Sequence, residues 1–141
     1  MTRFQSNADI KTFLLAGKAI LTLRSARTGT RYTFKVSKAK DRELWFVKLL
    51  TGSDNYSSYS YIGYFYKDLK FKTSAKSQFG FGALPMQAMR VLLEGLRQEE
   101  PKVHRQLEVY HEGSCGRCGR RLTVPESLMA GLGPECLKLS A

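Results

Sequence analysis

Residues 19–36 read Ala-Ile-Leu-Thr-Leu-Arg-Ser-Ala-Arg-Thr-Gly-Thr-Arg-Tyr-Thr-Phe-Lys-Val. Two short alternating runs of β-forming residues, 19–23 and 32–36, flank a turn at 25–30 in which Gly29 can take a positive φ. The pattern predicts a β-hairpin. Because no helix separates its strands, the sheet that it begins should be antiparallel.

The segments downstream extend this sheet and cover it. Residues 44–50, 59–66 and 69–72 are further expected strands, and 105–110 is a short strand-like segment. Residues 84–99 predict a helix with Pro85 in its first turn. Its apolar residues form one stripe, Met86, Met89, Leu92, Leu93 and Leu96. A shorter helix is expected at 9–16, with Asn7 as its N-cap and Gly17 at its end.

Positive charge is concentrated in the first third of the chain. The 141 residues carry a net charge of +11, and residues 1–50 hold 11 basic against 3 acidic side chains. The densest run contains Arg24, Arg27, Arg31, Lys35, Lys38, Lys40 and Arg42. Such a run attracts polyanions by releasing their counterions. The same charge would also suit an acidic protein surface, or serve only solubility.

Aromatic residues are dense between 56 and 71. On a regular strand, Tyr59 and Tyr61 would share one face, and Ile62, Tyr64 and Tyr66 the other. A helix can cover only one face, so we expect exposed tyrosines, of which Tyr59, Tyr61 and Tyr64 are candidates to stack nucleic-acid bases. The alternative is that the tyrosines simply tile both faces of the sheet.

All three cysteines lie near the end of the chain. Cys115 and Cys118 form a C-x-x-C pair, and Cys136 follows after 17 further residues. This spacing suits one tetrahedral metal ion, and zinc is the expected cofactor. A unit this small cannot be held by apolar burial, so the metal would supply its folding free energy. Thr123 to Glu126 has capping-box spacing for a short helix that ends near Ala130, before Gly131.

The sequence offers several candidates for the fourth ligand. His111, four residues before Cys115, is the chosen ligand, ahead of His104, Glu112 and Glu135. A redox C-x-x-C pair would need a helix N-terminus in a βαβ context, and free or disulfide-paired thiols are the other alternative. A catalytic zinc would need a nearby general base, and the deaminase pattern is not met.

Residues 111–136 resemble a small zinc-knuckle family of unassigned function that is frequent in bacteriophage and bacterial proteins. Its pattern is C-x-x-C-G-[RK]-x-L-T-x-P-x-S followed by G-[IL]-G-P-x-C, and nearly every position is met. Residues 28–34 and 59–63 are similar, more weakly, to the β-rich region before this knuckle in small phage proteins. The resemblance implies metal binding by Cys115, Cys118 and Cys136 and points to a phage or prophage origin.

The sequence therefore predicts an α+β protein, with a mostly antiparallel sheet of about five strands packed on one main helix and a C-terminal zinc knuckle. The expected units are a basic α+β domain at 1–103 and the zinc-knuckle unit at 104–141. The favoured function is non-enzymatic nucleic-acid binding through the basic hairpin and exposed aromatics. Arg117, Arg120 and Arg121 of the knuckle would add contacts.

Two other classes of function remain. A small basic phage-like protein could act as an anti-defence inhibitor or adaptor that binds an acidic surface of a host defence or transcription enzyme. An enzyme is disfavoured because no nucleophile triad, phosphate-binding glycine loop or carboxylate cluster is present.

No apolar run approaches the roughly 20 residues of a membrane span. The first residues also lack a signal-peptide pattern, so we expect a protein of the cytoplasm, that of the host cell if phage-encoded.

Overall fold

A computed structural model describes residues 1–52, 58–99 and 106–140 as an α+β fold with one seven-stranded antiparallel sheet. The strands are β1 (Thr2–Arg3), β2 (Lys18–Ser25), β3 (Arg31–Lys38), β4 (Leu44–Leu50), β5 (Tyr59–Tyr66), β6 (Phe71–Lys72) and β7 (Leu107–His111). The helices are α1 (Asn7–Leu14), α2 (Leu84–Arg97), α4 (Pro125–Ala130) and α5 (Pro134–Ser140). No helix in the described ranges is long and apolar enough to cross a membrane.

The sheet has the order β1-β7-β2-β3-β4-β5-β6, so the prediction of about five strands was too low. The predicted hairpin forms, with Leu21 opposite Phe34. Of the two strands beyond those five, β7 corresponds to the strand-like segment expected at 105–110, and β1 was not expected; β7 lies between β1 and β2 and pairs antiparallel with both. A two-residue strand such as β1 has no hydrophobic period, so local patterns could not reveal it. They also could not reveal its pairing with β7, because that pairing spans most of the sequence.

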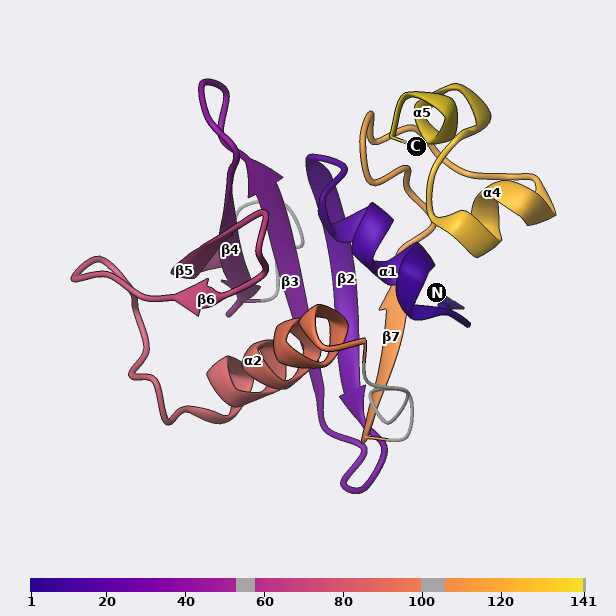
Figure 1. Ribbon diagram of the computed structural model, residues 1–141. Helices are drawn as coiled ribbons and strands as arrows, with labels where there is room; N and C mark the ends of the chain where they lie inside the picture. The colour runs from indigo at the N-terminus through magenta and orange to yellow at the C-terminus, as the bar shows by residue number, and fades with distance from the viewer. Residues whose placement is uncertain (53–57, 100–105, 141) are drawn as a thin grey trace.

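Both longer helices lie on one face of the sheet (Figure 1). The predicted α2 stripe is confirmed, because Met86, Met89, Leu92, Leu93 and Leu96 are all buried in the main core. The second helix, α1, was predicted two residues too late. Its N-cap is Ser6, not Asn7, and the Ser6 hydroxyl accepts a hydrogen bond from the Asp9 N–H at 3.1 Å.

A β-bulge changes which residues of β5 share a face. Val47 of β4 lies opposite Gly63, but the next residue, Lys48, lies opposite Tyr61, so Ile62 is the extra residue. Ile62 turns into the core, where it is fully buried. Because the register shifts by one, the four tyrosines Tyr59, Tyr61, Tyr64 and Tyr66 all lie on the face opposite the helices. The expectation that they divide between the two faces was wrong.

Residues 112–140, which we call the cysteine unit, form a turn followed by α4 and α5 at one end of the sheet (Figure 1). The expected short helix is α4, and Gly131 ends it with a φ of 73°. The capping box was wrong, since Val124 is the N-cap and no side chain caps the helix. The predicted unit boundary at 103/104 lies outside the described residues and stays a prediction.

Candidate functional site

The sulfur atoms of Cys115, Cys118 and Cys136 all lie within 4.8 Å of one another. Cys115 and Cys136 are buried and Cys118 is exposed. Three thiols that converge in this way could hold a metal ion. Sulfur donors suit zinc and other thiophilic metals rather than magnesium or calcium, which prefer oxygen ligands. The donor set therefore fits the predicted zinc, and the cysteines are brought together as the spacing predicted.

Local backbone geometry brings the sulfurs together. Gly119 has a φ of 81°, and its N–H donates to the Cys115 carbonyl at 2.9 Å. The Cys115 N–H donates to the Arg120 carbonyl at 2.8 Å, which closes the turn. Cys136 reaches the same place from the first turn of α5, which begins at Pro134. The two glycine-flanked arms thus meet at one small cluster.

The backbone around Cys115 favours its thiolate. The N–H groups of Gly133 and Arg117 donate to Cys115 Sγ at 3.4 and 3.5 Å. Burial alone would raise the pKa of the Cys115 thiol, but N–H donors from Cys118, Gly133 and Arg117 outweigh it and lower the pKa to about 7. Burial raises the pKa of Cys136, as do its neighbours Cys118 and Cys115. A metal ion would compete with protons for both sulfurs.

The structure does not bring His111 to the three sulfurs. Its ring is fully buried, and its Nδ1 accepts a hydrogen bond from the Gly113 N–H at 3.0 Å. The other nitrogen, Nε2, then carries the proton and donates to the Leu128 carbonyl. Burial lowers the pKa of this imidazole, which keeps it neutral. Both ring nitrogens are engaged, so His111 connects β7 to α4 through a hydrogen bond and does not take the expected place of the fourth metal ligand. His104 lies outside the described residues.

The cysteine unit packs tightly on α1 and β2. A Cβ on Gly116 would lie 2.6 Å from the Phe13 ring, and one on Gly131 would lie 2.7 Å from it. The Lys18 N–H at the start of β2 donates to the Gly116 carbonyl at 2.6 Å. The C-x-x-C turn is therefore packed against α1 and hydrogen-bonded to the start of β2.

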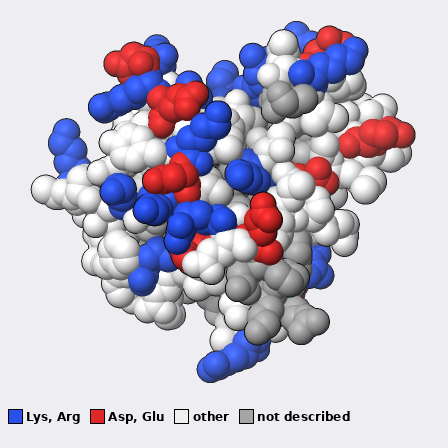
Figure 2. Space-filling view, in the orientation of Figure 1, with Lys and Arg blue, Asp and Glu red and all other residues white. Residues whose placement is uncertain are grey.

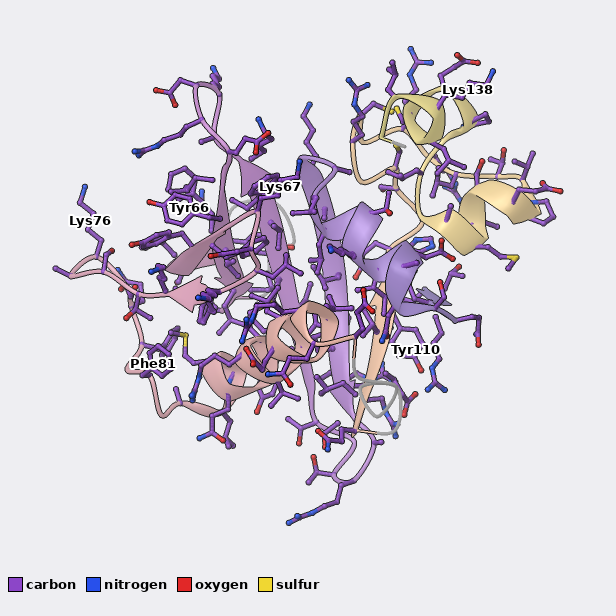
Figure 3. All side chains as sticks on the ribbon, in the orientation of Figure 1. Tyr66, Lys67, Lys76, Phe81, Tyr110 and Lys138 are labelled. Atoms are coloured by element: carbon purple, nitrogen blue, oxygen red, sulfur yellow. The ribbon has the colours of Figure 1, made fainter. Side chains whose placement is uncertain are left out.

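The open face of the sheet carries an aromatic groove of about 610 Å³. Its aromatic lining consists of Phe46, Tyr61, Tyr64 and Tyr66, with Arg42, Lys48 and Lys76 as cations. No acidic residue of the described chain lines it. Ring edges meet ring faces between Tyr61 and Phe46, at 6.2 Å, and between Tyr64 and Tyr66, at 5.8 Å. We call this surface the tyrosine groove; Tyr66 and Lys76 project from its side of the molecule in Figure 3.

Tyr59 lies outside this groove, farther along the same face. The ammonium of Lys35 lies 5.5 Å from the centre of its ring, within the range of a cation–π contact. Burial raises the pKa of the Tyr59 hydroxyl, with a smaller contribution from Glu112. Two of the candidate basic residues therefore lie beside candidate tyrosines: Lys35 over Tyr59, and Arg42 in the tyrosine groove.

The remaining basic candidates do not form one continuous stripe. Arg24 is ion-paired with Glu108, which neutralises its charge. Lys38 lies on the helix-covered side, over the Trp45 ring at 5.8 Å. Arg27 and Arg31 lie at one end of the β2–β3 hairpin, and Lys40 and Arg42 lie beyond the other end of β3. Arg117, Arg120 and Arg121 are exposed on the cysteine unit.

Several groove residues were missed by sequence reasoning, namely Phe46, Lys48 and Lys76. One signal was available. A glycine within a strand indicates a bulge or a close backbone approach, and a Cβ on Gly63 would lie 2.5 Å from the Lys72 carbonyl oxygen. The glycine could have warned that the alternation of Tyr59 to Tyr66 was broken.

Residues 105–139 match the model of a family of unknown function, DUF6011. The match covers the end of the chain that holds β7 and the cysteine unit. Neither the curated proteins nor the solved structures contain a significant match to this chain.

Proposed function

We propose that this chain is a non-enzymatic, zinc-stabilised protein that binds single-stranded nucleic acid in the tyrosine groove. The observation that carries the proposal is the bulge at Ile62, which places Tyr61, Tyr64 and Tyr66 on one face beside Phe46. Every base has a π-face, so such a row of rings can stack successive bases without reading their sequence.

The charge in the groove supports the same partner. Lys48, Lys76 and Arg42 line it, and no acidic residue of the described ranges does. Cations beside stacking rings can follow the phosphates while the bases lie on the aromatics. Double-stranded nucleic acid hides its base faces, so it could use the cations but not the rings. Preference for single strands is therefore the distinguishing property.

The metal has a structural role in this proposal. Bound zinc would hold Cys115, Cys118 and Cys136 together and so fix the cysteine unit on α1. The absence of enzymatic activity is part of the proposal. It is supported by His111, whose two ring nitrogens are both engaged in buried hydrogen bonds and cannot act as an acid or base toward a substrate.

The test is fluorescence anisotropy of the metal-loaded protein with labelled single- and double-stranded DNA and RNA of one sequence. We expect binding that persists at near-physiological salt and favours a single-stranded form. Tyr61→Ala and Tyr64→Ala should each weaken it by roughly 5- to 150-fold, because one stacked base contributes about 1–3 kcal/mol.

The matched controls are Tyr61→Phe and Tyr64→Phe, which keep the ring and should keep most of the affinity. Equal loss in the Phe and Ala variants would contradict stacking. Binding that vanishes with salt and ignores the form of nucleic acid would overturn the proposal. It would instead favour an acidic protein surface as the partner of the basic residues.

A further inference from the structure

A second cavity, of about 340 Å³, lies on the helix-covered side of the sheet. Its wall is built from four parts of the chain: the end of α1, the β3–β4 connection, the turn after β5 and the cysteine unit. The tyrosine groove shares no lining residue with it. Figure 3 shows Lys67, in the turn after β5, between the strands and the cysteine unit. We call this cavity the junction pocket.

The charge of the junction pocket is strongly positive. Four cations line it, Lys11, Lys38, Lys67 and Arg117, against the single carboxylate of Glu43. Within the described chain, no carboxylate lies at ion-pairing distance from any of these four side chains. Figure 2 shows basic side chains over the middle of this face, with acidic side chains among them. With only one carboxylate among them, the four positive charges around this concavity repel each other on balance, and an anion in the pocket would relieve that repulsion.

The floor of the pocket is rigid. Trp45 is 3% exposed, and its indole N–H donates to the Leu15 carbonyl at 3.2 Å. This hydrogen bond fixes the end of α1 against β4. The Lys38 ammonium lies over the same indole ring. The cations thus surround a fixed base and are not simply scattered on a mobile surface.

We propose that the junction pocket binds a phosphate group. A phosphate offers several oxygen acceptors in a tetrahedral arrangement, so it can accept from donors that approach from different sides. The four cations come from four segments and provide such donors, and the guanidinium of Arg117 can bind two oxygens at once. A carboxylate would satisfy fewer of them. This site is separate from the stacking surface and does not depend on it.

The cysteine unit contributes Arg117 and Leu139 to the pocket wall. Arg117 lies between the two metal-binding cysteines of the C-x-x-C turn. That turn is fixed to the body of the protein through Gly116 and the Lys18 N–H. Loss of the metal should loosen the turn and misplace Arg117, so phosphate affinity should depend on the metal.

The test is titration of the metal-loaded full chain, freed of unbound metal by gel filtration, with inorganic phosphate, followed by amide shifts in ¹H–¹⁵N NMR spectra. We expect saturable shifts at Lys38, Lys67 and Arg117. Lys38→Ala and Lys67→Ala should each weaken the affinity roughly tenfold, as expected for loss of one charged hydrogen bond. The matched control is Arg27→Ala, which removes one charge at the far tip of the β2–β3 hairpin and should leave the affinity unchanged.

Two oligonucleotides of one sequence, with and without a 5′-phosphate, distinguish the source of the group. Shifts at the pocket with inorganic phosphate and with the phosphorylated oligonucleotide, but not with its unphosphorylated counterpart, would assign a terminal phosphate of nucleic acid. Shifts with inorganic phosphate and neither oligonucleotide would assign free phosphate. The proposal is overturned if inorganic phosphate gives no saturable shift at these residues, or if Arg27→Ala weakens binding as much as Lys38→Ala. An affinity unchanged by metal removal would contradict the part assigned to Arg117.

Discussion

Gly116 lies directly against the ring of Phe13, so that a Cβ on the glycine would stand 2.6 Å from the ring. The glycine sits within the C-x-x-C turn, and the phenylalanine sits on α1 in the main core. This contact joins the candidate metal site to the body of the fold. It also yields a direct test of whether the two are coupled.

Gly116→Ala should destabilise the protein by about 1–3 kcal/mol, because the added methyl group overpacks a buried contact. Chemical denaturation of the metal-loaded protein measures the change. The matched control is Gly133→Ala, where an added Cβ meets no atom within 4 Å and the effect should stay within about 0.5 kcal/mol. Equal stability of the two variants would show that the turn is not packed on Phe13.

Cys136→Ser should weaken metal binding by more than the roughly 10- to 100-fold typical of an outer-shell change, because it removes a ligand. Competition with a chromogenic zinc chelator measures the affinity. Glu135→Gln is the control, since the carboxylate beside Cys136 is exposed, pairs with Lys138 and lies outside the cysteine cluster. A similar loss in Glu135→Gln would instead make this carboxylate a ligand.

Acid should destabilise the protein through His111. Burial lowers the pKa of this imidazole below its ordinary value of 6.5. Below that pH the unfolded chain binds a proton that the folded chain excludes, so stability falls as the pH falls, by up to about 1.4 kcal/mol per pH unit. Thermal unfolding at several pH values, with and without His111→Gln, measures this. Both proteins lose metal in acid, so the difference between their slopes of stability against pH isolates the effect of the imidazole. Equal slopes for the two proteins would contradict the prediction.

Arg24→Ala and Arg27→Ala remove the same charge but should differ in their effect on stability. Arg24 is ion-paired with Glu108, which also accepts a hydrogen bond from the Tyr110 hydroxyl. Its loss should cost at most about 1 kcal/mol, since the pair is partly exposed, and the cost should shrink with added salt. Arg27→Ala, at the hairpin tip, should cause no measurable loss of stability. A larger cost at Arg27 would show that the tip is held by more than its turn.

Local features of the fold could be predicted from the sequence. The bounds of β4 and β5 and the buried stripe of α2 follow from periodicity, which reports the environment of neighbouring residues. The convergence of Cys115, Cys118 and Cys136 likewise follows from ligand spacing and flanking glycines.

Features that depend on distant residues could not be predicted. Pairing of Thr2 with His111 joins segments more than 100 positions apart, which no local pattern encodes. The bulge at Ile62 reverses the alternation that periodicity assumes, so it hid the shared face of the tyrosines. The burial of His111 depends on Phe4 and Phe13, whose rings lie 5.2 and 5.8 Å from it. Proximity to Cys115 in the sequence therefore gave a plausible ligand that the fold uses elsewhere.

The position of β7 in the sheet bears on how the chain is made. A ribosome releases β2 and β3 early, but the strand that completes the other edge of β2 emerges only after residue 107. Until then, the backbone N–H and carbonyl groups of β2 form an open edge, the kind of surface on which chains aggregate. The edge is closed when β7 pairs with β2, and the cysteine unit is the segment of the chain that follows β7 directly. The nascent chain thus finishes its sheet and gains the three cysteines of the candidate metal site in one late step.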